Sequence, residues 1–277
     1  MTNAGETILV LGGTGKTGSR VAAELTRLGL SVRTAARNGA DARFDWDDPI
    51  THSPALADID RVYLVAPVLR TDFADQVSSV LDLAEAAGVR HVTYLSAFGI
   101  DQAPPQWVAH SAVELELMGR GAITHSILRP AWFMQNFSDT FLKPVDGVIT
   151  VPTGDGAEAF VDAEDIAAVA AATLASPDGH AGAEYAPTGP EALTVTPRHD
   201  RRRHRPAGEG LRHRPRGMDR RCRRGRRARR VRRGSSDADR TIAFGHGSRP
   251  NNDVHNVTGR PPISFADFAR RTAQAWA

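Results

Sequence analysis

The residues best suited to chemistry are four glycines near the start of the chain, Gly12, Gly13, Gly15 and Gly18. They follow an aliphatic run at 7–11, typical of a buried parallel strand, and precede apolar residues at helical spacing. An ordinary glycine turn is the alternative, but a strand, turn, helix and second strand within about thirty residues favour a dinucleotide site. The residues predicted to form it are Gly12, Gly13, Thr14, Gly15, Lys16, Thr17 and Gly18.

Each glycine of this turn has an expected role. Gly12 and Gly13 allow the sharp turn, Gly15 lets a diphosphate approach the backbone, and Gly18 lets the helix pack closely against the sheet. The first N–H groups of the helix and the positive end of its dipole then face the phosphates.

The end of the second predicted strand, 31–37, indicates which dinucleotide binds. An acid there would bind the ribose hydroxyls of NADH, but the strand ends in Arg37, with Arg33 four residues earlier. A planar guanidinium suits a 2′-phosphate, so NADPH is preferred over NADH. The alternatives are that both arginines are solvated, or that Asp41, which lies rather late, binds the ribose.

The elements that must position this site alternate along the chain. Apolar runs at 61–67, 91–99 and 123–130 are further strands. An amphipathic helix is expected from 73 to its end at Gly88, and another helix from a cap at Asp162 or Asp165 through Leu174. The pattern predicts an α/β fold, a Rossmann-type doubly wound parallel sheet, whose ligands bind at the carboxyl ends of the strands. Asp45 and Trp46 are then expected at the adenine end, and Ala66 and Pro67 on the nicotinamide side.

Several segments together resemble the NmrA-like, atypical short-chain dehydrogenase/reductase family, and most of all its ergot-alkaloid reductase branch, the agroclavine and festuclavine dehydrogenases. They cover residues 7–196 and about 250–276 and read GGTGKTG, FDWDDP, YLVAP, LSAFG, LRPAWFMQNF, PTGDGAEAFVDAEDIAAVA, TGPEALT and VTGRPPISFADFA. The resemblance implies one NAD(P)-binding domain over 1–277. Its Rossmann core would span about 5–175, and a small substrate-covering portion would be formed by about 130–160 and 183–277.

The tyrosine–lysine pair of ordinary short-chain dehydrogenases is absent. The chain has two lysines, Lys16 and Lys143, and neither has a tyrosine four residues before it. His110 stands at the family's lysine position and Gln106 at its tyrosine position, while Ser96 and Glu114 match a family serine and acid. Hydride transfer belongs to the cofactor, so Ser96 as a contact and His110 as a proton donor are the catalytic candidates. A structural role at the start of a helix is the alternative for His110.

The segment 130–137 follows a strand end, where ligands bind in such sheets. Pro130 is expected beside the cofactor, and Asn136 is expected to orient a flat substrate between apolar side chains. Core packing is the alternative, and at least two of the five substrate candidates are expected to face the pocket. These candidates are Trp132, Phe133, Met134, Asn136 and Phe137.

The charge of the chain is unevenly distributed. The net charge is +3, but residues 198–240 hold 19 arginines and five acids (+14), whereas the remainder holds 16 basic and 27 acidic residues (−11). This segment breaks the family pattern and has almost no apolar period. If the printed sequence is the real polypeptide, part of the substrate cover is missing, and we expect the segment to be disordered or irregular and activity to be weak. A compensated reading-frame slip in a GC-rich gene is favoured over a genuine basic arm, because the run at 220–234 contains no lysine and interrupts a domain.

The remaining sequence features limit the classes of protein to which the chain can belong. A single cysteine, Cys222, excludes an internal disulfide and fits the cytoplasm, and we find no signal peptide, membrane span or metal-ligand spacing. The sequence predicts an NADPH-dependent oxidoreductase that reduces a small iminium, quinone or carbonyl substrate without a Tyr–Lys pair. A non-catalytic redox sensor of NmrA type is the alternative, and nucleic acid is disfavoured as a partner.

Overall fold

A parallel sheet forms the centre of the computed structural model, which describes residues 5–67, 70–102, 109–140, 142–143, 156–194 and 249–276. In this part of the chain its strands run in the order β3-β2-β1-β4-β5-β6-β8, and every neighbouring pair is parallel. The predicted doubly wound α/β fold is therefore confirmed. The strands are β1 (Thr7–Leu11), β2 (Ser31–Ala36), β3 (Ala42–Arg43), β4 (Arg61–Val65), β5 (His91–Leu95), β6 (Thr124–Leu128) and β8 (Ala183–Tyr185).

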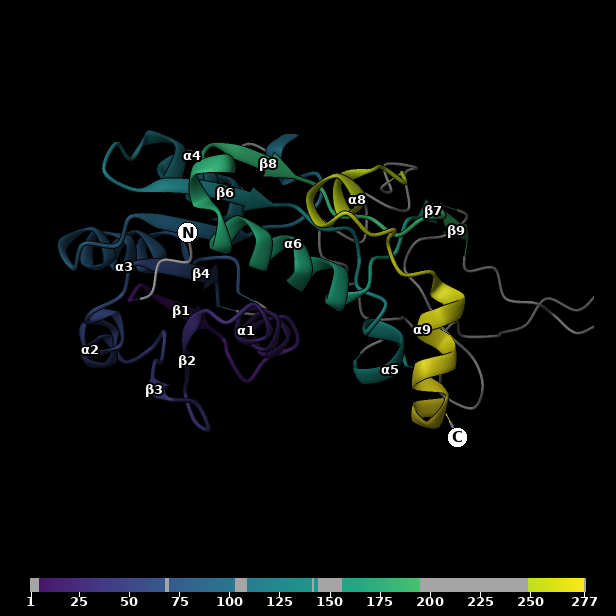
Figure 1. The fold of residues 1–277 in the computed structure, drawn as a ribbon, viewed down its shortest axis with the longest axis horizontal. Helices are drawn as coiled ribbons and strands as arrows, with labels where there is room; N and C mark the ends of the chain where they lie inside the picture. The colour runs from purple at the N-terminus through teal and green to yellow at the C-terminus, as the bar shows by residue number, and fades with distance from the viewer. Residues whose placement is uncertain are drawn as a thin grey trace, which may run out of the picture.

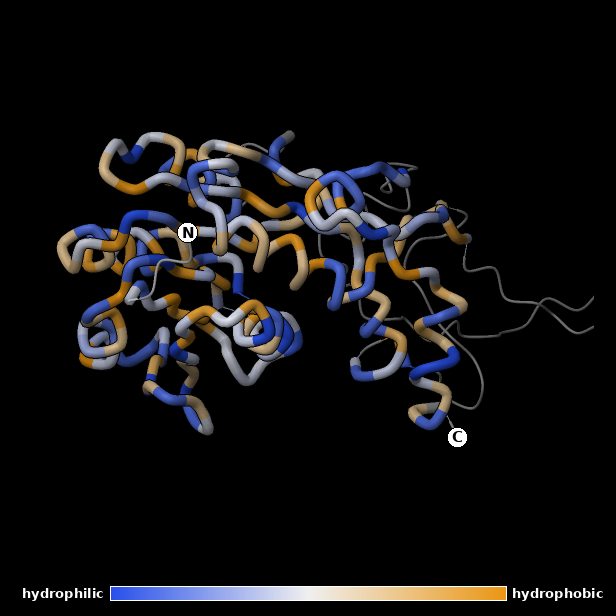
Figure 2. Tube along the Cα trace, in the orientation of Figure 1, coloured by the Kyte–Doolittle hydropathy of each residue, from blue (hydrophilic) through white to orange (hydrophobic). Residues whose placement is uncertain are grey.

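Helices cover both faces of the sheet (Figure 1). One apolar cluster joins the sheet to α1 and α6, and another joins its opposite face to α2, α3 and α4. The aliphatic runs that predicted the strands form this buried centre, and they stand out as apolar segments in Figure 2. The helices are α1 (Gly18–Arg27), α2 (His52–Leu56), α3 (Ala74–Ala86), α4 (Ala109–Gly119), α5 (Asn136–Asp139), α6 (Ala163–Ala175), α8 (Asp253–Thr258) and α9 (Phe265–Thr272), with 3-10 turns η1 (Pro49–Thr51), η2 (Ile100–Gln102), η4 (Pro177–Gly179) and η5 (Ala273–Trp276).

A smaller portion lies beyond one end of the sheet, where α5, α9 and the strands β7 (Ala157–Glu158) and β9 (Leu193–Thr194) come together (Figure 1). β7 and β9 pair antiparallel. Their apolar centre contains Met134, Phe137 and Phe268. Segments on either side of the arginine-rich run thus build one small core.

Two buried carboxylates at the start of α6 anchor the C-terminal helices. Asp162 is the N-cap of α6, since it accepts from the Glu164 N–H at 3.0 Å, and it also pairs with Arg271 of α9. Asp165 pairs with Arg260 and accepts from the backbone N–H of residue 263. Of the two predicted capping residues, Asp162 is therefore the cap, and Asp165 binds the chain that leads into α9.

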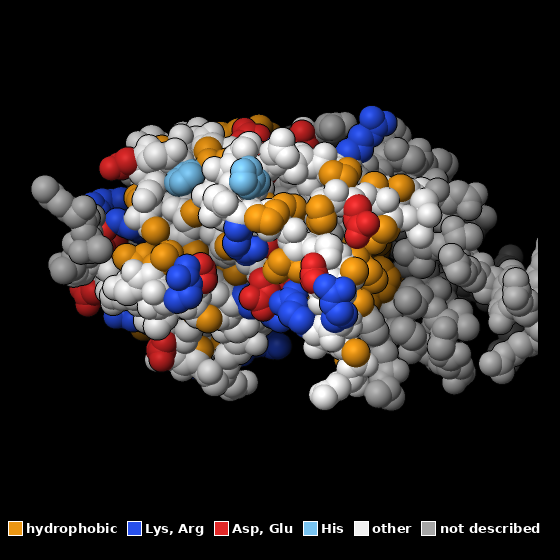
Figure 3. Space-filling model, turned by 45° about the vertical axis from the view of Figure 1, so that its right-hand side comes forward, with side chains coloured by type: hydrophobic (Ala, Val, Ile, Leu, Met, Phe, Trp, Pro, Cys, Tyr) orange, Lys and Arg blue, Asp and Glu red, His pale blue; other side chains and the backbone are white. Residues whose placement is uncertain are grey.

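The surface shown in Figure 3 carries mixed charge. Lys and Arg side chains lie beside Asp and Glu side chains on this face and do not gather into a basic patch. In the described part of the chain, no helix has the length and apolar character needed to span a membrane. The arginine-rich segment 198–240 and Gln106, both singled out from the sequence, lie outside the described residues.

Because His91 is buried, we expect the folded protein to lose stability in acid. It is 1% exposed, its Nδ1 lies 2.9 Å from the Thr124 hydroxyl, and burial lowers the pKa of His91 from 6.5 to about 4. In the unfolded chain His91 takes up a proton below pH 6.5, whereas in the folded chain it does so only near pH 4. The free energy of unfolding therefore decreases as pH falls from 6.5 to about 4. We expect His91 to account for a loss of about 3 kcal/mol, measured by urea unfolding at pH 7 and pH 4. His91→Gln should lose less stability over this range; an unchanged loss would contradict the prediction.

Candidate functional site

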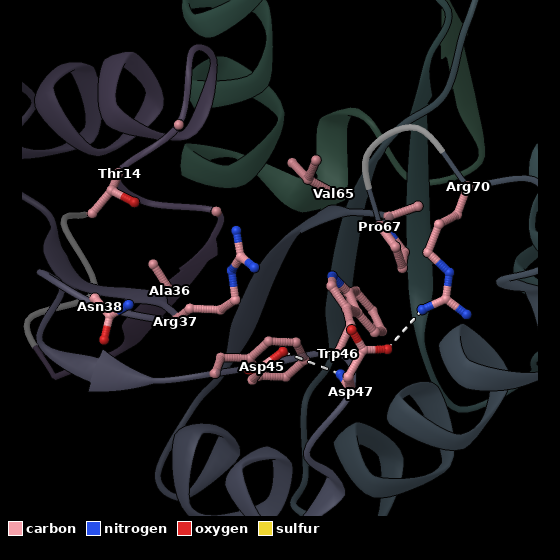
Figure 4. Close-up of a pocket in the computed structure, with 14 residues that line it drawn as sticks. Thr14, Ala36, Arg37, Asn38, Asp45, Trp46, Asp47, Val65, Pro67 and Arg70 are labelled. Atoms are coloured by element: carbon pink, nitrogen blue, oxygen red, sulfur yellow. Dashed lines mark hydrogen bonds and ion pairs between the residues drawn. The ribbon is translucent and has the colours of Figure 1, made fainter.

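A cavity of about 520 Å³ opens at the carboxyl ends of β1, β2 and β4 (Figure 4). Parallel strands end at one edge of their sheet, so residues far apart in the sequence meet there. Its lining includes eight residues predicted from the sequence to lie against the cofactor. These are Gly12, Thr14, Gly15, Arg37, Asp45, Trp46, Ala66 and Pro67.

The glycine turn has the shape that its sequence predicts. Gly12 adopts φ +66°, a conformation that side chains disfavour, and the Gly15 N–H donates to its carbonyl at 2.8 Å. Gly12 and Gly15 line the cavity, so backbone without side chains faces the cavity there. Gly18 begins α1, and a Cβ placed on it would lie 2.2 Å from the Gly12 carbonyl oxygen. Gly18 therefore allows the start of α1 to pack directly against the backbone of Gly12 in the turn. The sequence had predicted that Gly18 would allow the helix to pack against the sheet.

The other predicted residues of the turn do not line the cavity. Gly13 and Thr17 are buried, and the Gly13 N–H is bonded to Ala35 of β2. Lys16 is half-buried and donates to Asn136 Oδ1 at 3.2 Å, and burial lowers the pKa of Lys16. A predicted cofactor residue and a predicted substrate residue, 120 positions apart, are therefore in contact.

The residues considered for cofactor choice point in different directions. Arg37 follows β2 and extends among the lining residues (Figure 4). Arg33 lies outside the lining and donates to the Ala57 carbonyl at 2.6 Å. Asp41 accepts from the backbone N–H and the hydroxyl of Thr34, at 2.9 and 2.8 Å, and also lies outside the lining. Of these three, Arg37 alone is placed to meet a ligand.

The wall of the cavity around Trp46 contains residues that the sequence did not single out. Trp46, which was predicted, stands edge-on to Phe44 with ring centroids 5.0 Å apart. Arg70 reaches across from the chain after β4 and pairs with Asp47 at 2.8 Å (Figure 4). Asn38 also lines this wall. The FDWDDP motif drew attention to its aspartates, but no nearby sequence pattern predicts that Arg70 pairs with one of them.

A buried ion-pair network surrounds Ser96, just beyond β5. The Ser96 hydroxyl donates to Glu114 of α4, which is 3% exposed. Arg129 binds both oxygens of that carboxylate, from Nε at 3.0 and 3.1 Å and from a terminal nitrogen at 2.8 Å. Arg129 also pairs with Glu184 at 2.5 Å. The network fixes the direction of the Ser96 hydroxyl.

His110 lies on the same helix as Glu114, one turn earlier. Its Nδ1 is 2.6 Å from the Tyr94 hydroxyl, and its ring stands edge-on to Phe73. Burial lowers the pKa of His110 to about 4. The imidazole is therefore neutral at pH 7, and any proton donation by His110 would come from its neutral ring.

The substrate candidates of 130–137 divide into residues that are buried in the core and residues that are partly exposed. Met134 and Phe137 are each 1% exposed in the apolar core, which makes the expectation that they wall a pocket wrong for these two. Apolar character alone suits a core as well as a pocket wall. The partly buried candidates are Trp132, Phe133 and Asn136, and Pro130 is buried with its carbonyl accepting from the Phe98 N–H at 3.2 Å. Within the described residues, no cluster of His, Cys, Asp or Glu is arranged to hold a metal ion.

Comparison with known proteins agrees with this geometry. A profile described as NAD(P)H-binding matches residues 12–177. An uncharacterized oxidoreductase of Bacillus subtilis, YesF, is 33% identical over 97% of this chain and 96% of its own length. Festuclavine synthase II of Penicillium roqueforti is 31% identical over 98% of this chain and 100% of its own length. The NADPH-dependent quinone oxidoreductase QOR2 of Escherichia coli, solved with NADPH, shares the fold with a TM-score of 0.68 at 20% identity, over 95% of this chain and 99% of that one.

The family match covers the strand, glycine turn and helix that build the cavity, and the two relatives in sequence extend over nearly the whole chain. Both the resemblance noted in the sequence and the expectation of an enzyme are thereby confirmed. The chain belongs to the NAD(P)H-binding family, in its NmrA-like, atypical short-chain dehydrogenase/reductase group, and is an NAD(P)H-dependent oxidoreductase.

Proposed function

We propose that this protein uses NADPH to reduce a small unsaturated substrate, an iminium, quinone or carbonyl compound, without a Tyr–Lys pair. The observation that carries the proposal is the cavity formed by Gly12, Gly15 and Arg37 at the carboxyl edge of the sheet. The turn offers backbone to a diphosphate, and Arg37 offers a cation to a 2′-phosphate. NADPH supplies the hydride when bound.

The chain's own residues position the reactants. All four of Asp45, Trp46, Ala66 and Pro67 line the cavity. We propose that Asp45 and Trp46 form its adenine end and that Ala66 and Pro67 continue it toward β5. Ser96 follows β5 at the same edge, so we place the reacting ring near it. Trp132, Phe133 and Asn136 are proposed to hold the substrate, with Pro130 beside the cofactor. His110 is proposed to donate from its neutral ring.

The substrate class is supported by what relatives are named for. These relatives include an azoreductase of Xenophilus azovorans and festuclavine synthase II, and the structural neighbour from Escherichia coli is a quinone oxidoreductase. Iminium ions and conjugated quinones accept hydride with little proton assistance, which fits a chain without the Tyr–Lys pair. We propose the cytoplasm as the site of action, since its reducing conditions suit a chain with one cysteine.

The test is NADPH oxidation, followed at 340 nm, with a panel of quinones, cyclic iminium ions and aldehydes, beside NADPH titration by fluorescence. We expect saturable binding and turnover of at least one class. Binding without turnover of any class would replace the reductase with the redox sensor. Absence of binding by the folded chain would overturn both.

For residues 198–240 we propose a compensated frame slip. The relatives align over nearly the whole chain, so family sequence continues on both sides of the arginine-rich segment. We expect the alternate reading frame of the gene to encode an apolar-periodic stretch between these points. A frame interrupted by stop codons, or one equally rich in arginine, would contradict this.

A further inference from the structure

The Ser96 hydroxyl donates its hydrogen to another group of the protein. A hydroxyl has one hydrogen to donate and two lone pairs to accept with, whereas a carboxylate can only accept. Ser96 donates to Glu114, whose two oxygens are held by the Arg129 guanidinium. This guanidinium holds the carboxylate in place, because charge-assisted bonds of this geometry are strong. Ser96 therefore presents lone pairs to a neighbouring ligand and has no proton left for it.

The position of Ser96 indicates which ligand group meets those lone pairs. Val65 of β4 is paired in register with Leu95 of β5, so Ser96 stands beside Ala66, which lines the cavity. Neighbouring strands lie about 4.8 Å apart, so a ligand that crosses the end of β4 comes next to Ser96. The nicotinamide end of a dinucleotide whose diphosphate lies on the glycine turn extends in this direction.

We infer that Ser96 accepts a hydrogen bond from the carboxamide N–H of the nicotinamide, and that Glu114 and Arg129 are positioning residues that keep Ser96 an acceptor. The inference rests on the proposed function and adds a specific group of the cofactor to it. Ser96 thereby selects the orientation of the nicotinamide ring and leaves proton donation to other groups. The carboxamide supplies two N–H donors, and an acetyl group in its place supplies none.

The experiment compares dissociation constants for NADPH and its 3-acetylpyridine analogue, in which acetyl replaces the carboxamide. The wild-type chain should bind NADPH about tenfold more tightly than the analogue, the value of one hydrogen bond of ordinary strength. Ser96→Ala should reduce this ratio to about one. Ser126→Ala is the matched control, because its buried hydroxyl donates to the His180 carbonyl just after η4, and it should keep the full ratio.

Glu114→Gln tests the positioning role. The glutamine amide can donate to Ser96, which frees the hydroxyl proton to face the ligand, so the ratio should again approach one. Arg129 keeps Glu184 as a partner in this variant, and circular dichroism checks its fold. A tenfold ratio retained in folded Glu114→Gln overturns the positioning role. A ratio near one in the wild type, or a full ratio in Ser96→Ala, overturns the inference while NADPH binding itself sustains the proposed function; if the wild type binds neither nucleotide, both fall.

Discussion

Replacing Gly18 with alanine is expected to abolish measurable NADPH binding and to lower the free energy of unfolding by about 3 kcal/mol. A Cβ at this position would lie 2.2 Å from the Gly12 carbonyl oxygen and 2.7 Å from its carbon. Both atoms are backbone, so no side chain can turn aside to make room. The start of α1 must therefore move away from the turn, and the N–H groups that we propose to bind phosphate move with it.

The control for this substitution is Gly119→Ala. Gly119 ends α4, and a Cβ there would meet nothing within 4 Å. The alanine should change the free energy of unfolding by less than about 1 kcal/mol, in the stabilising direction, because alanine favours a helix more than glycine does. NADPH affinity should stay within about twofold of the wild type. Urea unfolding and fluorescence titration measure both quantities, and normal NADPH binding by Gly18→Ala would contradict the assigned role of the turn.

The glycine turn that lines the cavity was predictable from the sequence because its signals are local. The aliphatic run of β1, the glycine spacing and the apolar period of α1 each depend on residues within a few positions of one another. Arg37 was found in the same way, from its place at the end of a strand. Such patterns decide local structure and, in a parallel sheet, also decide which edge the residues share.

The rest of the site depends on packing that no local pattern encodes. Lys16 meets Asn136 across 120 positions, and Arg70 meets Asp47 from a different loop. Glu114 was noticed as a family acid, but its partner Arg129 becomes visible only when α4 lies on β6. The segment 130–137 shows most clearly that sequence alone does not tell core residues from pocket residues. Met134 packs in the core, whereas Trp132 and Phe133, from the same strand end, are partly exposed.

Replacing Arg37 with alanine is expected to raise the dissociation constant for NADPH about thirtyfold and to leave that for NADH within about twofold. The two nucleotides differ by the 2′-phosphate, so a loss confined to NADPH identifies the group that Arg37 contacts. Arg37 is exposed and lines the cavity, and none of the ion pairs within the described residues engages it. Its guanidinium is therefore available to a ligand, and its effect should weaken as salt concentration rises.

Arg33→Ala removes the same charge from β2, four residues before Arg37, and serves as the matched control. Its guanidinium donates to the Ala57 carbonyl outside the cavity, so NADPH affinity should change by less than about threefold. Titrations of both nucleotides at low and at physiological salt separate a bidentate contact from a general loss of positive charge. Equal weakening of NADPH by the two variants would mean that overall charge, and not the position of Arg37 at the end of β2, sets the preference. Equal weakening of NADPH and NADH by Arg37→Ala would place this arginine on the shared diphosphate, and the choice of cofactor would then depend on another residue of the wall.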